Sequence, residues 1–232
     1  ISLPKRVYGH GWILSGEKKM SKSLGNILDP IQIIKKYGID QLRYYLMKEV
    51  SLGHDGNISL ENLTNCINND LANNYGNLCQ RVFSFIKKNC NNKIPKPSSL
   101  TNEDKNLLNN LRNDLPNLIN NIDNQDLNIY IKKVVGASFE ANKYFNDSQP
   151  WTLKKTDTNR MNTILYTICL QIKNLSILLN PIIPLASNKI LDTINHPKNS
   201  RNLLSINSDK DISHTTELNE ISILFSKIDH DN

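Results

Sequence analysis

The sequence predicts a mostly α-helical protein, and three observations support this. From Ser59 onward, apolar residues recur at intervals of three and four, which is the spacing of amphipathic helices. Prolines lie between these stretches or near their ends. Strand-forming Val, Tyr, Trp and Ile gather in one short stretch, Arg6 to Leu14. We therefore expect an all-α bundle of about five helices with short loops, preceded by a small extended segment.

The N-terminal segment is expected to be extended and punctuated by glycine. A strand is predicted over residues 6–14, followed by a turn at Ser15-Gly16-Glu17 and a basic loop over residues 18–26. One or two strands cannot form a stable domain alone. We therefore expect this segment to be the edge of a sheet whose remainder is absent.

The next elements are two short helices. Asp29 is a favourable N-cap for a helix over residues 31–37, which should end at Gly38. Asp40 is then expected to cap a second helix over residues 41–48. Arg43 and Lys48 of that helix are candidates for phosphate contacts or for a solvated surface.

The remaining helices follow from the apolar periodicity. They are expected over residues 59–88, 101–121, 126–145, 159–179, 185–194 and 217–227. The proline-containing stretch 93–98 is expected to be a linker.

The composition narrows the possible functions. The chain has 232 residues and a net charge of +6, which favours an anionic partner, with nucleic acid first. No apolar run reaches the roughly 18–20 residues of a membrane helix, so no membrane partner is expected. The four cysteines form no C-x-x-C pair, so we expect reduced thiols in a cytoplasmic protein and no metal site.

The basic loop is the first candidate site. Lys19-Met20-Ser21-Lys22-Ser23 places two ammonium groups and two hydroxyls in one turn. Such a loop can close over a polyphosphate and neutralise the charge of a leaving pyrophosphate. A basic loop is usually only a solvated surface. The continuation into L-G-N and D-P favours the phosphate-binding interpretation here.

The second candidate site is a polar row on the first long helix. Asn73, Asn77 and Arg81 are spaced by four residues, so they share one face beside the apolar stripe. Amide and guanidinium groups can hydrogen-bond to a base edge. Trp151, directly after Pro150, can stack on an unpaired base. Spacing alone favours a solvated helix face for the polar row. A lone tryptophan at a helix end is more often a core residue than a stacking platform.

These motifs resemble the methionyl-tRNA synthetases, a family of class I aminoacyl-tRNA synthetases. The resemblance runs from about residue 4 to residue 179. It is carried by K-M-S-K-S-L-G-N, K-Y-G-I-D-Q-L-R-Y-Y-L, H-D-G-N-I-S, N-D-L-A-N-N-Y-G-N-L-C-Q-R and Q-P-W. The pentapeptide K-M-S-K-S also occurs in synthetases for valine, isoleucine, leucine and cysteine. The R-Y-Y-L and G-N-L-x-x-R segments favour methionine.

The resemblance implies a layout in three parts. Residues 1–27 would be the C-terminal end of the Rossmann catalytic domain, a remnant that carries the KMSKS loop. Residues 28–58 would be a small helix-rich connecting unit that contacts the tRNA stem. Residues 59–232 would be the anticodon-binding α-helical bundle.

The resemblance also assigns roles to individual residues. Lys22 would assist the adenylation transition state and Lys19 would be a secondary phosphate contact, within an ATP loop that includes Met20, Ser21 and Ser23. In the bundle, Asn77 and Arg81 would contact anticodon bases. Trp151 would stack against the anticodon.

The implied enzyme is a methionine–tRNA ligase of protein biosynthesis. It would use ATP with Mg²⁺, methionine and tRNA(Met).

One departure from the family pattern limits this expectation. The second class I signature, H-x-G-H, does not occur, since no two of the five histidines are three residues apart. The methionine pocket would also lie upstream. We therefore expect the C-terminal portion of the enzyme, inactive alone. The alternatives are a stand-alone helical tRNA- or RNA-binding module without catalysis, and a fragment of another class I synthetase.

Overall fold

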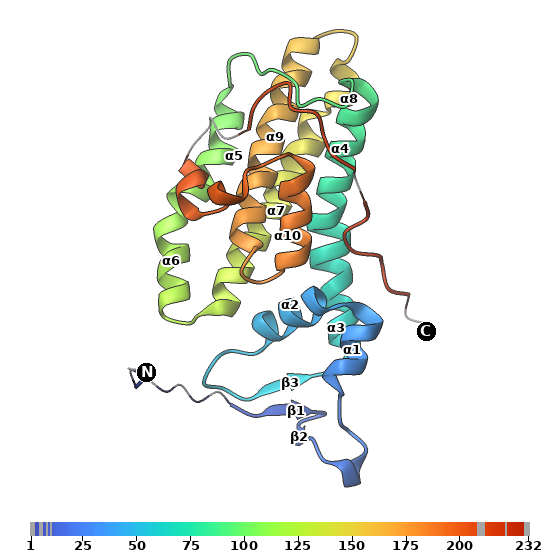
Figure 1. Cartoon of the computed structure of the whole chain (residues 1–232), viewed down its shortest axis with the longest axis vertical. Helices are drawn as coiled ribbons and strands as arrows, with labels where there is room; N and C mark the ends of the chain where they lie inside the picture. The colour runs from blue at the N-terminus through green and yellow to red at the C-terminus, as the bar shows by residue number, and fades with distance from the viewer. Residues whose placement is uncertain are drawn as a thin grey trace.

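The computed structural model describes residues 3, 4, 7, 9, 11–207, 212–220 and 222–229, without the side chain of Lys22. A small sheet lies at one end of an elongated molecule, and the helical bundle forms the other end (Figure 1). Helices α1 (Pro30–Tyr37) and α2 (Ile39–Glu49) lie between them. The mostly α-helical fold class predicted from the sequence is confirmed.

The small sheet joins residues from two separate parts of the chain. Strand β1 (Ile13–Ser15) pairs antiparallel with β2 (Lys18–Lys19) and parallel with β3 (Gly56–Ile58), in the order β2-β1-β3. Gly16 and Glu17 have φ values of 60° and 62°, as a two-residue hairpin turn of the primed type requires. Residues 11 and 12 of the predicted strand lie outside β1, and its residues 6, 8 and 10 lie outside the described part of the chain. The parallel partner of β1 follows α2 in the sequence.

The two short helices begin and end largely as predicted. The Asp29 side chain caps α1 by accepting a hydrogen bond from the Ile31 N–H, and Gly38 ends the helix with φ 106°. The expected cap at Asp40 is wrong. Asp40 lies inside the first turn of α2, and its carboxylate accepts a hydrogen bond from the Ala186 N–H at 2.8 Å.

The predicted long helix over residues 59–88 is a continuous helical run with a change of geometry in its middle. Ser59 caps α3 (Leu60–Cys66), which passes into the π-helix η2 (Ile67–Gly76) and then into α4 (Asn77–Asn89). The π-helical segment is wider than an α-helix. The spacing of apolar residues does not predict this change, because the apolar stripe remains continuous through the segment.

The other helices build the bundle around α9. Their bounds are α5 (Asn102–Asn113), α6 (Leu115–Asp123), α7 (Leu127–Ser148), α8 (Pro150–Leu153), α9 (Thr158–Leu179) and α10 (Pro184–Thr193), with short 3₁₀ turns η1 (Lys22–Leu24), η3 (Lys198–Ser200) and η4 (Leu203–Asn207). The single helix predicted over residues 101–121 is broken at Asp114. Pro116 lies in the first turn of α6, where its missing N–H does no harm.

The helix predicted over residues 217–227 is wrong. The described C-terminal residues form an irregular coil along the bundle, red in Figure 1. Leu218 and Phe225 are buried, and the coil pairs with Ile94 through Ile94 N–H to Thr216 O at 2.9 Å and Thr215 N–H to Ile94 O at 2.8 Å. Contacts with the bundle therefore replace the hydrogen bonds of the expected helix.

Helix α9 is the centre of the core. Among the described residues it is also the one helix long and apolar enough to cross a membrane, but 94% of its apolar window is buried inside the protein. Its closest packing partners are α7 and α10. These contacts identify α9 as the hydrophobic centre on which the bundle is assembled.

Candidate functional site

The basic loop between β2 and α1 is closed by one asparagine. The Asn26 side chain accepts a hydrogen bond from the Ser21 N–H at 2.9 Å and donates to the Lys19 carbonyl at 3.3 Å. The Ser21 hydroxyl accepts from the Leu24 N–H and lies 3.2 Å from the Ser23 hydroxyl. The loop is therefore a compact turn with internal hydrogen bonds. Asn26 was not singled out from the sequence, although L-G-N directly follows the pentapeptide.

The predicted loop residues lie in different surroundings. Lys19 is exposed at the end of the hairpin, and its ammonium group lies 4.1 Å from the centre of the Trp12 ring, a cation–π distance. Met20 is partly buried, and its sulfur accepts a hydrogen bond from the Leu28 N–H at 3.5 Å. The backbone of Lys22 begins η1, and its side chain lies outside the described part of the structure.

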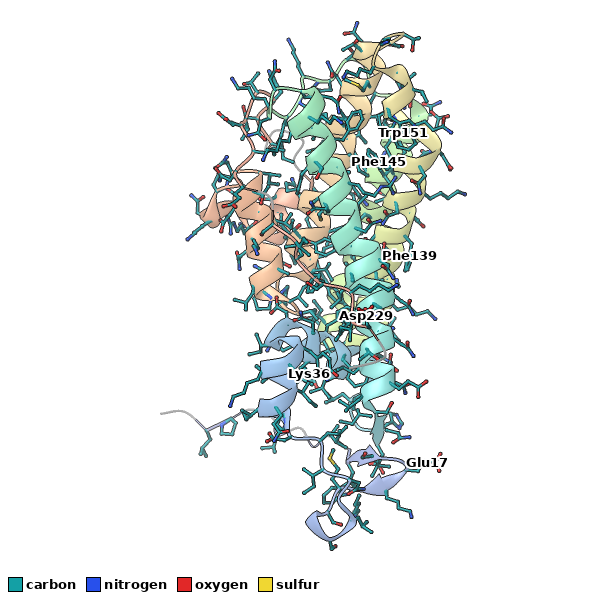
Figure 2. The ribbon with its side chains drawn as sticks, turned by 90° about the vertical axis from the view of Figure 1, so that its right-hand side faces the viewer. Glu17, Lys36, Phe139, Phe145, Trp151 and Asp229 are labelled. Carbon is teal, nitrogen blue, oxygen red and sulfur yellow. The ribbon has the colours of Figure 1, made fainter. Side chains whose placement is uncertain are left out.

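In the bundle, Arg81 and Trp151 meet at a third residue, Phe145. The Arg81 guanidinium lies 5.2 Å from the Phe145 ring centre and donates to the side-chain oxygen Oδ1 of Asn146 at 2.7 Å. The Phe145 and Trp151 rings are 5.8 Å apart in an edge-to-face arrangement. Figure 2 shows these two rings together, far from the sheet end marked by Glu17. We call Arg81, Phe145 and Trp151 the aromatic cluster.

The exposure of the cluster differs between its members. Trp151 is 43% exposed, whereas Phe145 is buried beneath it. The edge-to-face contact supports the Trp151 ring from one side and leaves part of it open to solvent. Phe145 was missed as a site residue. Its sequence signal is an aromatic residue at the end of a helix, a few positions before another aromatic residue.

Asn77 lies one turn before Arg81 but borders a different hollow. This hollow has a volume of about 220 Å³, and Asn73, Gln80 and Ile223 also line it. Asn77 is exposed, and within the described residues no hydrogen bond joins it to Phe145 or Trp151. The structure thus brings Arg81 and Trp151 to the same ring, that of Phe145, and places Asn77 one turn before Arg81 on α4.

A buried carboxylate joins α7, the helix that carries Phe145, to α5 and α9. Asp104 accepts hydrogen bonds from the Tyr144 hydroxyl at 2.5 Å and from both terminal nitrogens of Arg160 at 2.5 and 2.9 Å. Tyr144 is the neighbour of Phe145 on α7, and Arg160 lies in the first turn of α9. Burial raises the pKa of the Asp104 carboxyl, but the hydrogen bonds from Arg160 and Tyr144 outweigh this and hold the pKa below its ordinary value.

The two cations of α2 make contacts within the protein. Arg43 donates to the carbonyls of Ile182 at 3.0 Å and Pro181 at 2.8 Å. Lys48 pairs with Asp70 at 2.8 Å. Burial lowers the pKa of Lys48, but the contact with Asp70 outweighs this and raises the pKa to about 12. Both side chains therefore join α2 to the bundle, and the phosphate contacts considered for Arg43 and Lys48 stay predictions.

The cysteine and acidic side chains that the structure describes form no metal centre. Within the described ranges, no group of three His, Cys, Asp or Glu side chains is placed to hold an ion. The four cysteines are free thiols, and burial raises the pKa of Cys66 to about 12. A thiol with so high a pKa is protonated at neutral pH and is a poor metal ligand.

Comparisons with known families match both halves of the chain. A family model described as class I tRNA synthetases (M) matches residues 1–83. A second model, described as the anticodon binding domain of methionyl tRNA ligase, matches residues 94–232.

Individual relatives agree with these matches. The chain is similar to the methionine–tRNA ligase of Brucella melitensis, with 40% identity over 89% of this chain and 40% of that protein. It is 36% identical to the methionine–tRNA ligase of Rickettsia felis, over 100% of this chain and 46% of that protein. It thus spans less than half the length of these relatives.

A solved structure agrees with the sequence matches. It is the Mycobacterium tuberculosis methionyl-tRNA synthetase in complex with methionyl-adenylate. The TM-score is 0.91 at 34% identity, over 97% of this chain and 45% of that one.

Proposed function

Because the chain belongs to the methionyl-tRNA synthetase family, we propose that it is the part of such an enzyme that supplies the ATP loop and reads the anticodon of tRNA(Met). The whole enzyme is then a cytoplasmic ligase that joins methionine to its tRNA through an adenylate. In this proposal, residues 1–27 form the C-terminal end of the catalytic domain. Residues 28–58 connect it to the helical bundle, and residues 59–232 are the bundle that binds the anticodon. The aromatic cluster is the single observation that carries the anticodon-reading part.

The proposed role of the KMSKS loop in ATP binding rests on the positive charge of the loop and on the glycines that flank it. The loop sequence contains two cations, Lys19 and Lys22. Asn26 holds the turn through the Ser21 N–H and the Lys19 carbonyl, and the hydroxyls of Ser21 and Ser23 lie 3.2 Å apart. The sulfur of Met20 accepts a hydrogen bond from the Leu28 N–H. The glycines before and after it, at positions 16 and 25, have positive φ values of 60° and 64°, which permit a change of loop direction.

Within this loop, Lys22 is assigned the larger catalytic role. A cation that meets the leaving pyrophosphate stabilises the transition state more than the bound ATP. The Mg²⁺ that accompanies ATP is coordinated mainly by phosphate oxygens and water.

The anticodon part follows from the geometry of the cluster. The open part of the Trp151 ring is a platform for an unstacked base, and Phe145 holds that ring in place from below. Arg81 presents a planar guanidinium beside this platform, and Asn77 presents an amide that can donate and accept. Together they can both stack and hydrogen-bond to bases of an open loop.

The test is a titration of the 232-residue chain with two RNA hairpins. One hairpin carries the anticodon CAU and the other differs from it in one anticodon base. Trp151→Ala should weaken binding of the CAU hairpin by about 1–3 kcal/mol, which is roughly 5- to 150-fold in Kd. Arg81→Gln should act in the same direction. Both variants should lose affinity for CAU more than for the altered hairpin.

Two controls separate recognition from folding and from general charge. Trp12→Ala removes the other tryptophan, which lies at the sheet end, and should leave the discrimination unchanged. Lys88→Ala removes an exposed cation from α4 and should weaken both hairpins alike, with a smaller salt dependence. Equal losses for both hairpins in Trp151→Ala, or a lower melting temperature as its main effect, would contradict the assignment.

A further inference from the structure

The helical run before Arg81 contains a widened segment. Over the ten residues of η2 the backbone has π-helical geometry, and at its end the Asn77 N–H donates to the Ala72 carbonyl five residues earlier. Such segments are rare and occur frequently at functional sites. Here the segment ends at the turn that carries Asn77 and leads to Arg81.

Gly76 fits this widened turn for a steric reason. A Cβ atom at Gly76 would lie 2.8 Å from the Leu71 carbonyl oxygen, five residues earlier in the same segment. It would also lie 3.4 Å from the ring of Phe225. The first distance is too short, so any larger residue would have to push the backbone of η2 aside, whereas the second is an ordinary van der Waals contact. The widened geometry is thus built into the local sequence.

Asn74 fastens the segment to α7. It is 1% exposed, and its side-chain oxygen accepts hydrogen bonds from Asn142 Nδ2 at 2.8 Å and Ser138 Oγ at 3.2 Å. Its own amide donates to the Val135 carbonyl at 3.4 Å, and Asn142 Nδ2 also lies 3.2 Å from the Asn74 backbone carbonyl. A buried polar network of this kind, with its members satisfied, specifies one arrangement of its helices.

The rotation of α4 depends on this arrangement. Each residue advances an α-helix by about 100°, so an extra residue accommodated in η2 rotates every later side chain relative to α3. We propose that Asn74 and Asn142 are positioning residues, which lock η2 against α7 and so set the rotation of α4 that directs Arg81 to Phe145 and Asn146. This rests on the proposed function, in which the aromatic cluster reads a base.

A double-mutant cycle tests the proposal with the same two hairpins. Asn142→Leu removes the amide that donates to Asn74. Tyr130→Phe is the matched control, since it removes a buried hydrogen bond of α7, to the Leu178 carbonyl at 2.6 Å, away from Asn74. Each change is made with and without Arg81→Gln. The readout is the ratio of the two Kd values, together with the free energy of unfolding in urea.

A positioning role predicts coupling to Arg81. Asn142→Leu should reduce the discrimination to the level of Arg81→Gln, and adding Arg81→Gln should change it less than twofold further. In the Tyr130→Phe background, Arg81→Gln should still reduce the discrimination between the hairpins as much as it does in the unmodified chain. Asn142→Gln keeps an amide donor and should restore part of the discrimination, whereas Asn142→Asp has no donor and should not. Ser138→Ala is a milder variant that weakens the same network if Asn142→Leu fails to fold.

Two results would overturn the proposal and are distinguishable. In the first result, Arg81→Gln lowers the discrimination between the two hairpins by the same factor in the Asn142→Leu and Tyr130→Phe backgrounds. Asn142 then does not act through Arg81, although the anticodon assignment stands. If the unmodified chain binds both hairpins alike, the anticodon assignment itself fails, and the positioning role fails with it.

Discussion

Replacement of Asp104 by asparagine should destabilise the bundle by about 3 kcal/mol, which is the lower end of the cost of breaking a buried ion pair. Asp104 is fully buried and accepts two hydrogen bonds from Arg160, one from Tyr144 and one from the Thr101 N–H. In Asp104→Asn the Arg160 guanidinium would face a neutral amide. The lower end applies because the Arg160 side chain is 24% exposed and can regain contact with water.

Urea unfolding of the 232-residue chain at pH 7 measures this effect. With an m value of about 3 kcal/mol per M, the midpoint should fall by roughly 1 M. Asp114→Asn is the control, because the Asp114–Lys133 pair is solvated and should contribute at most about 1 kcal/mol. Equal midpoints for Asp104→Asn and Asp114→Asn would refute the reasoning.

The same pair predicts a pH dependence. Because the pKa of Asp104 is lowered in the folded protein, its contribution to stability is fully present above the ordinary aspartate pKa of about 3.9. The contribution is lost as the pH falls through the lowered folded-state pKa. The difference between the unmodified chain and Asp104→Asn should therefore be largest near neutral pH and shrink below about pH 4. A difference that grows on acidification would contradict this sign.

Three further predictions concern the loop and the widened segment. The chain alone should show no methionine-dependent pyrophosphate exchange with ATP, because H-x-G-H does not occur in it; exchange above background would contradict the proposed division of the enzyme. In a full-length synthetase that contains this segment, Lys22→Ala should lower the adenylation rate, measured by rapid quench, with little change in methionine affinity; weaker methionine binding at an unchanged rate would give Lys22 another role. Gly76→Ala should destabilise the chain by about 1–3 kcal/mol in urea, because its Cβ would overlap the Leu71 carbonyl; an unchanged midpoint would show that the segment relaxes freely.

Local signals account for the parts of the fold that the sequence predicted well. Three residues at helix ends act within one helical turn: Asp29 before Pro30, Gly38 after α1 and Ser59 before α3. Their effect therefore depends only on neighbouring residues in the sequence. The break at Asp114 also has a local signal, Pro116, which an argument from apolar periodicity alone passes over. The coil after Leu218 depends instead on hydrogen bonds with a distant segment.

The candidate site shows the same division. Residue types, spacing and the family resemblance predicted Arg81 and Trp151 one at a time, and the pentapeptide predicted the loop. Their meeting at Phe145 required α4 to pack against α7, a contact between residues far apart in sequence. Arg43 and Lys48 were ambiguous in sequence because a cation looks the same whether it faces solvent or a buried carbonyl.

The sequence by itself therefore determined the helical class, the starts of α1 and α3 and the residues that carry the family motifs. Tertiary structure alone decided the rotation of α4, through Asn74 and Asn142, and the burial of Asp104 between Tyr144 and Arg160. The physical reason is the distance along the chain between the residues that interact. Caps, turns and periodicity stabilise a segment through its own neighbours, whereas side-chain networks gain their free energy only when separate helices have packed together.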